Sequence, residues 1–536
     1  MLVRLFVAAI LCCTSLAHAQ EPDPDELPRF EFGGLNQKQI TKRIFSKERD
    51  TISKLGSLRF VTEAYMQSLG HRQVKGVDVA LDEATERVID DAYFLARVEF
   101  GQVYGDSPVE RVLSGERTWR SHLILTNAGR SEYLFAEGFL AIFFPDLYGF
   151  NADMYSLIYK ERESLVDTDC LVFSVAPVSE RASGRFRGEI WVDSSSYAIV
   201  RLKGVFTGPY DEHWYTGPRH YYHFDSWREK VANGSWLPSA AYFDERRTFR
   251  ADGNLEFHFR GYALLWQQQK ERATAPQMSK SSSDTGNTSV LEGQSVPDSQ
   301  NNVVARLDAD GLLANPGEEE QRLDRIVHQI APIGEMGTHK IACRLLLTTP
   351  AEMFAVGDLI IVSRGLLNIV PDDSVLAFML ARQVAHIVLR HTGTVAQPFP
   401  KSVFDLEGKK GFTGLGVRWT PNEEVAADSK AIVLMRGTQY DNAVADTAVF
   451  LSELKSQSRR FPNLVRSRFG VGVIQEGSSL ASKQQVGTVV QGENLQFKNR
   501  YGVSWNRVVI DSEEESEHAE GQSLKRPGAL QTSVAK

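Results

Sequence analysis

Between Phe60 and Trp266 the sequence consists largely of short segments in which apolar and polar residues alternate. The stretch GEIWVDSSSYAIVRLKG (188–204) has two such segments around a serine-rich turn, and YYHFDSWREKVANGSWLPSAAYFDERRTF repeats the pattern with a turn at 232–234, as is typical of β-hairpins. Because alternation makes one face of each strand apolar, such strands must share a sheet and bury that face. We therefore expect a long, curved antiparallel β-sheet. Further runs complete the region: SHLILTN, SEYLFAEG, CLVFSVAPV and LEFHFRGYALLW, preceded by a helical pattern over 36–54.

The composition changes after this region. Residues 267–302 are rich in serine, glutamine, threonine and proline and offer little to bury. Helical spacing returns near Glu318, and the 536 residues, 42% of them hydrophobic, are enough for two cores. The predicted fold class is α+β: an N-terminal curved antiparallel sheet and a mainly helical C-terminal domain with a small sheet. The expected boundaries are 1–19 for a signal peptide, 20–266 for the β-rich domain, 267–317 for a disordered linker, 318–477 for the helical domain and 478–536 for a largely disordered tail.

The N-terminus MLVRLFVAAILCCTSLAHAQ predicts export. Arg4 precedes an apolar run that ends in Ala-x-Ala at 17–19, the pattern of a cleaved signal peptide and too short for a spanning helix. No later stretch is long and apolar enough to cross a bilayer, so we expect a secreted, periplasmic protein without a transmembrane segment. The remaining cysteines, Cys170 and Cys343, are expected to be unpaired buried thiols. The net charge of −8 includes no basic block, so nucleic acid is not an expected partner.

The stretch PDDSVLAFMLARQVAHIVLRH (371–391) predicts a buried helix. Proline and two aspartates form its start, and the following residues are apolar on nearly every side. Arg382, Gln383 and His386 lie within it, and burying them costs free energy unless each finds a partner. Since Arg382 and His386 are four positions apart, both project from the same face of the helix.

A second helical pattern, NEEVAADSKAIVLM (422–435), follows downstream. With it, the chain resembles the zinc metallopeptidases of the HtpX, BepA and CAAX-prenyl-protease type, members of the gluzincins. The family's H-E-x-x-H helix is matched by Arg382-Gln383-Val384-Ala385-His386, followed by Arg390-His391, and its E-x-x-x-D motif by Glu424 and Asp428. AVGDLIIVSRGLLNIVPDDSVLAFML is similar to the family's strand and G-L-L run, and RLDRIVHQIAPIG to the preceding helix. The resemblance covers less than a third of the chain.

The resemblance implies a metal site, and the departures from the motif bear on its chemistry. In the family two histidines and one glutamate hold zinc, and a second glutamate acts as general base. Gln383 stands at the position of that catalytic base but cannot take up a proton near neutral pH. Arg382 stands at a ligand position and, as a permanent cation, cannot bind zinc. His386 and Glu424 are then vestigial metal ligands, and no cofactor is expected, or zinc if the family site is partly retained.

A structural replacement for the metal is expected instead. If the family's helix arrangement is kept, Arg382 points toward the Glu424 carboxylate and neutralises it in the metal's place. Asp428 and His391 are expected to be structural residues around this pair. His391, five positions after His386, is expected to rotate off the face that they would share.

The stretch DLIIVS offers a second candidate site. In peptidases of this type the strand at the cleft pairs with an extended substrate, so Asp358, Ile360 and Val362 are candidate peptide-binding residues that act through main-chain hydrogen bonds. The alternative is a core strand with a covered edge.

The β-rich domain resembles, through GRFRGEIWVDSSSYAIVRLKG, the curved half-barrel of periplasmic lipoprotein carriers, which implies a sheet able to hold an acyl chain or an apolar protein segment. A purely structural β-domain is the alternative. Together the patterns favour a non-catalytic binding or scaffolding pseudoprotease of the cell envelope, with an extended peptide or an envelope protein as client. Two other functions stay open: a metal-dependent endopeptidase like the family, and a carrier of lipid or lipoprotein through the β-domain.

Overall fold

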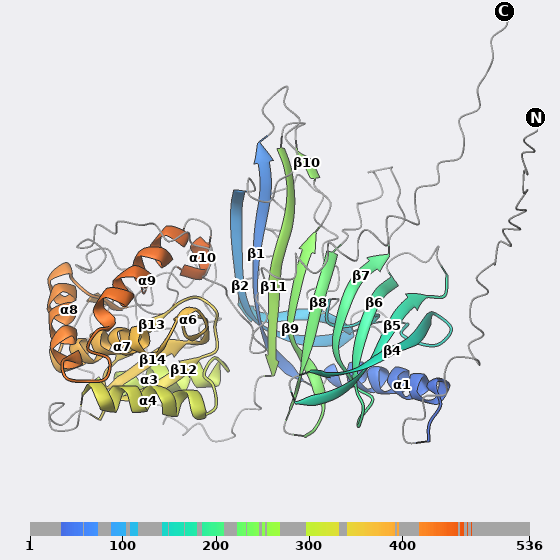
Figure 1. Ribbon diagram of the computed structural model, residues 1–536, viewed down its shortest axis with the longest axis horizontal. Helices are drawn as coiled ribbons and strands as arrows, with labels where there is room; N and C mark the ends of the chain where they lie inside the picture. The colour runs from blue at the N-terminus through green and yellow to red at the C-terminus, as the bar shows by residue number, and fades with distance from the viewer. Residues whose placement is uncertain are drawn as a thin grey trace, which may run out of the picture.

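The computed structural model describes residues 34–56, 58–72, 87–102, 108–115, 142–147, 149–165, 167–179, 185–207, 222–231, 233–245, 249–251, 255–267, 296–331, 340–391, 394–395, 417–458, 461–465, 469 and 473. Within them the chain is a mixed α+β structure with one large antiparallel sheet and a helical part that contains a smaller sheet, as predicted (Figure 1). The predicted signal peptide, the runs SHLILTN and SEYLFAEG, and the C-terminal tail lie outside the described residues.

The large sheet has eleven strands in the order β3-β2-β1-β11-β9-β8-β7-β6-β5-β4, with β10 paired to β11. Its pairings are antiparallel, and the two predicted hairpins are β6–β7 and β8–β9. The predicted helix before them is α1 (Gln37–Leu55), which begins at a capping box formed by Asn36 and Gln39. The strands are β1 (Arg59–Arg72), β2 (Arg87–Gln102), β3 (Pro108–Gly115), β4 (Tyr155–Leu165), β5 (Thr168–Pro177), β6 (Arg185–Asp193), β7 (Ile199–Thr207), β8 (Tyr222–Lys230), β9 (Trp236–Glu245), β10 (Phe249–Ala251) and β11 (Leu255–Gln267).

Four neighbouring strands, β2, β1, β11 and β9, carry buried apolar side chains on both faces, because successive side chains point to opposite sides of a strand. One face, which we call the α1 face, packs in one core with α1 and residues from 142–150. The other, which we call the seam face, packs in one core with the helical part. On the α1 face lie Phe60, Ala64, Phe94, Ala96, Val98, Ala241, Phe243, Ala263 and Leu265. On the seam face lie Val61, Tyr65, Tyr93, Leu95, Tyr242 and Tyr262.

Polar contacts across the seam fix how the two domains dock. Asn463 donates from its backbone and its side chain to the Asp91 carboxylate, at 2.9 and 2.6 Å. Arg97 forms an ion pair of 2.8 Å with Asp310. These contacts join β2 to residues far along the chain, so the sheet and the helical part form one packed unit.

The sheet is curved (Figure 1), and two glycines face each other in its β6–β7 hairpin. Gly188 and Gly204 are register partners. A Cβ at Gly188 would overlap the Lys203 carbonyl oxygen, and one at Gly204 would overlap the Arg187 carbonyl oxygen. Strand glycines of this kind allow two backbones to approach more closely than any side chain permits.

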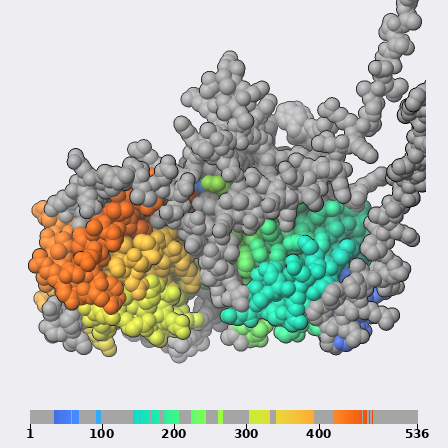
Figure 2. All heavy atoms as spheres, viewed as in Figure 1, coloured from blue at the N-terminus to red at the C-terminus, as the bar shows by residue number. Residues whose placement is uncertain are grey.

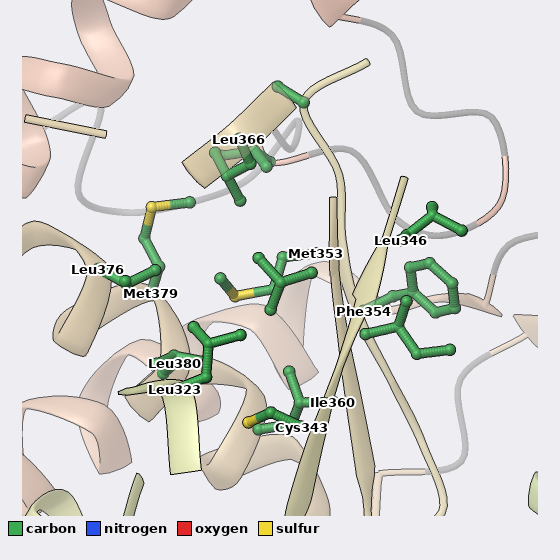
Figure 3. Packing of buried hydrophobic residues seen from close by; sticks show 14 of the residues in the cluster. Leu323, Cys343, Leu346, Met353, Phe354, Ile360, Leu366, Leu376, Met379 and Leu380 are labelled. Atoms are coloured by element: carbon green, nitrogen blue, oxygen red, sulfur yellow. The ribbon is translucent and has the colours of Figure 1, made fainter. Parts of the chain in front are cut away.

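The helical part surrounds a three-stranded sheet of order β12-β14-β13. Helices and strands pack through a continuous set of aliphatic side chains and methionines, among them Leu323, Met353, Ile360 and Leu380 (Figure 3). No helix within the described residues is long and apolar enough to cross a membrane. The elements are α3 (Val296–Ala309), α4 (Glu318–Ile330), β12 (Ala342–Leu346), β13 (Met353–Val356), β14 (Leu359–Ser363), α6 (Arg364–Ile369), α7 (Asp373–Val388), β15 (Thr394–Val395), β16 (Val417–Arg418), α8 (Pro421–Met435), α9 (Ala443–Gln457) and α10 (Pro462–Val465).

The two lobes are visible on the surface, with the helical part in yellow to orange and the strands from β4 onward in cyan to green (Figure 2). The prediction of a disordered linker as far as residue 317 is wrong at its C-terminal end. Residues 296–309 form α3, and Val303, Leu307, Leu312 and Leu313 join the core of the helical part. Four apolar residues within a polar stretch were too weak a pattern to predict that packing.

The two cysteines are buried and unpaired, as predicted. Burial raises the pKa of the Cys170 thiol to about 12. Since the thiolate is the reactive species, Cys170 is inert at neutral pH.

A buried ion pair ties α1 to β8. Arg228 Nη1 and Nη2 lie 2.6 and 2.5 Å from the two carboxylate oxygens of Glu48, and Nη2 also donates to the Phe143 carbonyl at 3.1 Å. Both charged side chains are only 1% exposed. Two parallel hydrogen bonds between side chains shielded from solvent set the position of the helix on the sheet, and each charge depends on the other.

Glu48→Ala is expected to lower the free energy of unfolding by about 3–5 kcal/mol, because Arg228 would stay buried without its counter-ion. Urea unfolding followed by circular dichroism measures the change. The control is Glu189→Ala, which removes the partner of Lys160, a lysine whose side chain is 49% exposed. That exposed pair is expected to contribute less than about 1 kcal/mol. Equal losses in the two variants would contradict the role given to burial.

Candidate functional site

The candidate site lies between α7 and α8. Helix α7 begins at Asp372, whose side chain accepts from the backbone N–H groups of Ser374 and Val375, as the sequence pattern predicts. Its residues from Val375 to Ile387 are all buried. Helix α8 begins at a capping box formed by Thr420 and Glu423, with a proline at its first turn. Both helices are therefore held at their N-terminal ends, which sets the position of the charged side chains between them.

Arg382 bridges the two carboxylates of α8. Its Nη2 donates to Glu424 Oε2 at 2.7 Å, and its Nε donates to Asp428 Oδ1 at 2.6 Å. All three side chains are almost fully buried. The expected contact between Arg382 and Glu424 is present, and the same guanidinium also holds Asp428. With both carboxylates ionised this group of three would carry one excess negative charge.

His386 lies one turn after Arg382 and is enclosed by two rings. Its Nδ1 is 2.9 Å from Nδ1 of His391, so one imidazole donates to the other. Its ring stacks on Trp419 with centroids 4.2 Å apart. Its Nε2 faces Glu424 Oε1 at 3.8 Å.

The backbone, not the helix period, brings His391 to His386. Helix α7 ends in a Schellman motif, in which the N–H of His391 donates to the His386 carbonyl and the N–H of Arg390 donates to the Ile387 carbonyl, each at 3.0 Å. Arg390 takes the left-handed conformation that this motif requires, with φ 53°. The prediction that His391 rotates away from His386 is therefore wrong, because it extended the helix past its actual end.

Burial sets the protonation of the site. It raises the pKa of Glu424 to about 7, although Arg382 acts to lower it. Burial, together with His391 and Arg382, lowers the pKa of His386 to about 3. His386 is therefore neutral at physiological pH, and its 3.8 Å approach to Glu424 is not an ion pair. Among the described residues, Glu424 Oε1 and Gln383 Oε1 are buried acceptors without a hydrogen-bond donor.

The residues present do not fit a zinc site. Tetrahedral catalytic sites use three protein ligands, whereas here only His386 and Glu424 occupy predicted ligand positions. Arg382 sits against Glu424 with its positive charge, where a third ligand would be needed. Gln383, which the sequence resemblance aligns with the family's general base, cannot accept a proton near neutral pH. Within the described residues, no three His, Cys, Asp or Glu side chains are grouped to hold a metal ion.

The structure contradicts the prediction that the DLIIVS strand borders a cleft. The strand is β14, the middle of its sheet, paired with β12 on one side and with β13 on the other. Ile360 and Val362 are fully buried, and the backbone carbonyl of Asp358 accepts from the N–H of Ala342, the first residue of β12. An added peptide strand has no free edge of β14 to pair with, so the covered core strand is the correct alternative.

Trp419 was not among the residues predicted from sequence. It directly precedes the cap of α8, in the sequence WTPNEE, where Thr-x-x-Glu with a following proline predicts a helix start. In a hydrophobic staple the apolar residue before such a cap packs against the fourth helical residue, but that residue is Glu424 here. The sequence therefore gives no signal that Trp419 packs on the ring of His386.

Comparisons with known proteins do not assign this chain to a family. No family model matches the chain, and no curated protein matches it. A DUF1329 family protein from Desulfovibrio piger is 11% identical with a TM-score of 0.20, over 43% of this chain and 92% of that one. MucB in the Pseudomonas aeruginosa MucA/MucB complex is 9% identical with a TM-score of 0.14, over 43% of this chain and 99% of that one. With TM-scores this low, neither structure informs the fold or the function of this chain.

Arg382→Ala is expected to destabilise the protein by about 3–5 kcal/mol, because the buried carboxylates of Glu424 and Asp428 would lose the guanidinium that bridges them. Chemical unfolding at neutral pH measures the loss. Arg322→Ala is the matched control, because Arg322 pairs with Glu319 and Asp373 on the surface and its side chain is 37% exposed. An Arg382 variant as stable as the control would mean that the two carboxylates need no counter-ion.

The lowered pKa of His386 predicts a pH dependence of stability. The unfolded chain binds a proton at the ordinary pKa of 6.5, whereas folded His386 does so only near 3, so stability falls as the pH drops between these values. His386→Gln is expected to remove this part of the acid sensitivity. Thermal unfolding midpoints of both proteins across this range measure it. Parallel pH curves for the two would show that His386 titrates normally in the folded state.

Proposed function

We propose that this chain is an exported cell-envelope protein whose helical domain is of the zinc metallopeptidase type but binds or scaffolds other molecules without catalysis. One observation carries the proposal: Arg382 contacts Glu424 at 2.7 Å and Asp428 at 2.6 Å at the place where the family motif requires a metal ligand. A guanidinium there holds the helices together electrostatically and supplies no Lewis acid.

The loss of the general base supports the same proposal. Metal-assisted peptide hydrolysis needs a group that takes a proton from the attacking water. Gln383 occupies that position and stays neutral and unprotonated. The titratable groups His386 and Glu424 lie nearby, but the ring of His386 is held by His391 and Trp419, and Glu424 is bound to Arg382. Neither stands at the position of the base in the family motif.

The geometry also supports a metallopeptidase ancestry. Zinc bonds of about 2.0–2.1 Å in a tetrahedral site place two ligand atoms roughly 3.4 Å apart. His386 Nε2 and Glu424 Oε1 lie 3.8 Å apart and face each other. Two of the family's ligand positions are thus close to the separation that one metal ion would impose, while Arg382 fills the third.

Carriage of lipid by the β-domain receives less support. The α1 face, which would have to hold an acyl chain, is packed with side chains of the protein itself, from α1 (Ile40, Ile44, Phe45) and from Ile142 and Phe143. The Glu48–Arg228 pair anchors α1 over that face. A carrier function would require α1 to leave its place, which would separate this buried pair at a large cost in free energy.

Zinc content separates the proposal from its endopeptidase alternative. The purified wild-type chain is expected to hold much less than one zinc per chain, measured by metal mass spectrometry without chelators. Arg382→His/Gln383→Glu restores the family motif and is expected to bind zinc, detected as stoichiometric metal and a zinc-dependent rise in melting temperature. The single variant Gln383→Glu is the control and is expected to remain without zinc.

One tightly bound zinc in the wild-type chain would contradict the proposal of a non-catalytic domain. A folded double variant without zinc would instead contradict the metallopeptidase ancestry. The two results are independent, because the first concerns the present site and the second concerns the arrangement of the helices.

A further inference from the structure

Glu63 is a carboxylic acid buried in the middle of the seam between the two domains. It lies on β1 between Val61 and Tyr65, on the seam face, and is 0% exposed. Its Oε1 accepts from the Thr349 N–H at 2.7 Å, and its Oε2 accepts from the Thr349 hydroxyl at 2.9 Å. Thr349 belongs to the helical part, so this carboxyl joins the two domains directly.

The groups that face Glu63 come from every element around it. Tyr93 of β2 donates its hydroxyl to Oε1 at 2.6 Å. Tyr262 of β11 and Arg364 at the start of α6 are close enough to interact with it electrostatically. The positive charge of Arg364 favours the ionised form of Glu63.

Docking buries this carboxyl, and burial penalises its charged form. Burial raises the pKa of Glu63 above its ordinary value of 4.5, while the hydrogen bonds from Tyr93 and Thr349 and the charge of Arg364 act to lower it. With the domains apart, Glu63 would lie on an exposed face of β1 and titrate normally. The docked form therefore binds the proton more tightly than the undocked form.

The direction of the pH effect follows from the difference in bound protons between the docked and undocked states. Where the docked state holds more protons than the undocked state, lowering the pH favours docking, and raising it favours separation. The effect begins as the pH rises through the ordinary value of 4.5 and is complete once it passes the raised value in the docked state. Other charged groups of the seam have partners of their own: Asp91 accepts from Asn463, Arg97 pairs with Asp310, and Arg260 donates to Gln67.

We propose that Glu63 makes the docking of the two domains pH-sensitive, so that the seam tightens as the medium becomes more acidic and loosens as it becomes more alkaline. A neutral side chain would give a seam of constant strength. A buried carboxyl with hydrogen-bond donors from both domains instead links the proton concentration to the exposure of the seam face, whose aromatic side chains are Tyr65, Tyr93, Tyr242 and Tyr262.

Hydrogen–deuterium exchange at the Thr349 amide tests the proposal, because this N–H donates to Glu63 across the seam. Protection factors, corrected for intrinsic exchange, are compared at about pH 5 and about pH 8, on either side of the expected titration. Wild type is expected to lose about tenfold in protection for each unit by which docking raises the pKa. Glu63→Gln, neutral throughout, is expected to show pH-independent protection and to exceed wild type at the higher pH.

Glu320→Gln is the matched control. Glu320 is also buried and bonded, to Arg344 and to the Leu345 N–H, but it lies within the helical part. It is expected to leave the pH trend at Thr349 unchanged. Should Glu63→Gln fail to fold, Thr349→Val removes one donor to the carboxylate and is expected to steepen the loss of protection with rising pH.

Two results with Glu63→Gln would overturn the proposal. One is the same pH trend in Glu63→Gln as in wild type, which would assign the effect to another group. The other is weaker protection in Glu63→Gln at every pH, which would mean that the seam is held best by the ionised carboxylate. An unchanged trend in Thr349→Val would likewise contradict control by Glu63.

Discussion

The structure depends on a group of strands that have to be buried on both sides. In β1, residues Phe60 and Ala64 face α1, while Val61 and Tyr65 face the helical part. A sheet with only one apolar face could stand alone with the other in water, but this one cannot. The helical part therefore completes the β-domain, and the β-domain in turn covers one side of the helical part. The tyrosines of the seam face are buried only when the helical part is docked on the sheet. Undocked, they would form an exposed patch of large aromatic side chains, and large patches of this kind are rare on protein surfaces.

Within these cores, each deeply buried cation has an assigned counter-charge. Arg228 has Glu48, and Arg382 has both Glu424 and Asp428. Such pairs gain little over apolar residues of equal volume, but they are very costly to break. These pairs therefore contribute little net stability, but they fix the position of α1 on the sheet and of α8 against α7. In the helical part, Arg382 restricts how α8 can lie against α7.

Much of the large sheet could be predicted from the sequence because alternation is local: the β6–β7 and β8–β9 hairpins follow from residues a few positions apart. The contact of Arg382 with Glu424 could be expected only because a family motif supplied the relation between two distant helices. Where no motif helped, long-range partners were missed. Glu48 and Arg228 are 180 positions apart, and nothing in either segment names the other. Glu63 interrupts the apolar side of β1, which is a visible anomaly, but its partner Thr349 is 286 positions away. The central position of β14 was missed for a related reason, since an apolar run does not reveal which of its edges are paired.

The facing glycines of the β6–β7 hairpin have an evolutionary consequence. A change at Gly188 is blocked by the backbone beside Gly204, and a change at Gly204 by the backbone beside Gly188. Substituting both would add two clashes instead of relieving one, so no order of single mutations leads away from the pair without first moving the strands apart. Descendants of this sequence can therefore exchange most apolar side chains of the sheet for others of similar size, while these two positions, which contribute no side chain at all, are held to glycine by the backbone around them.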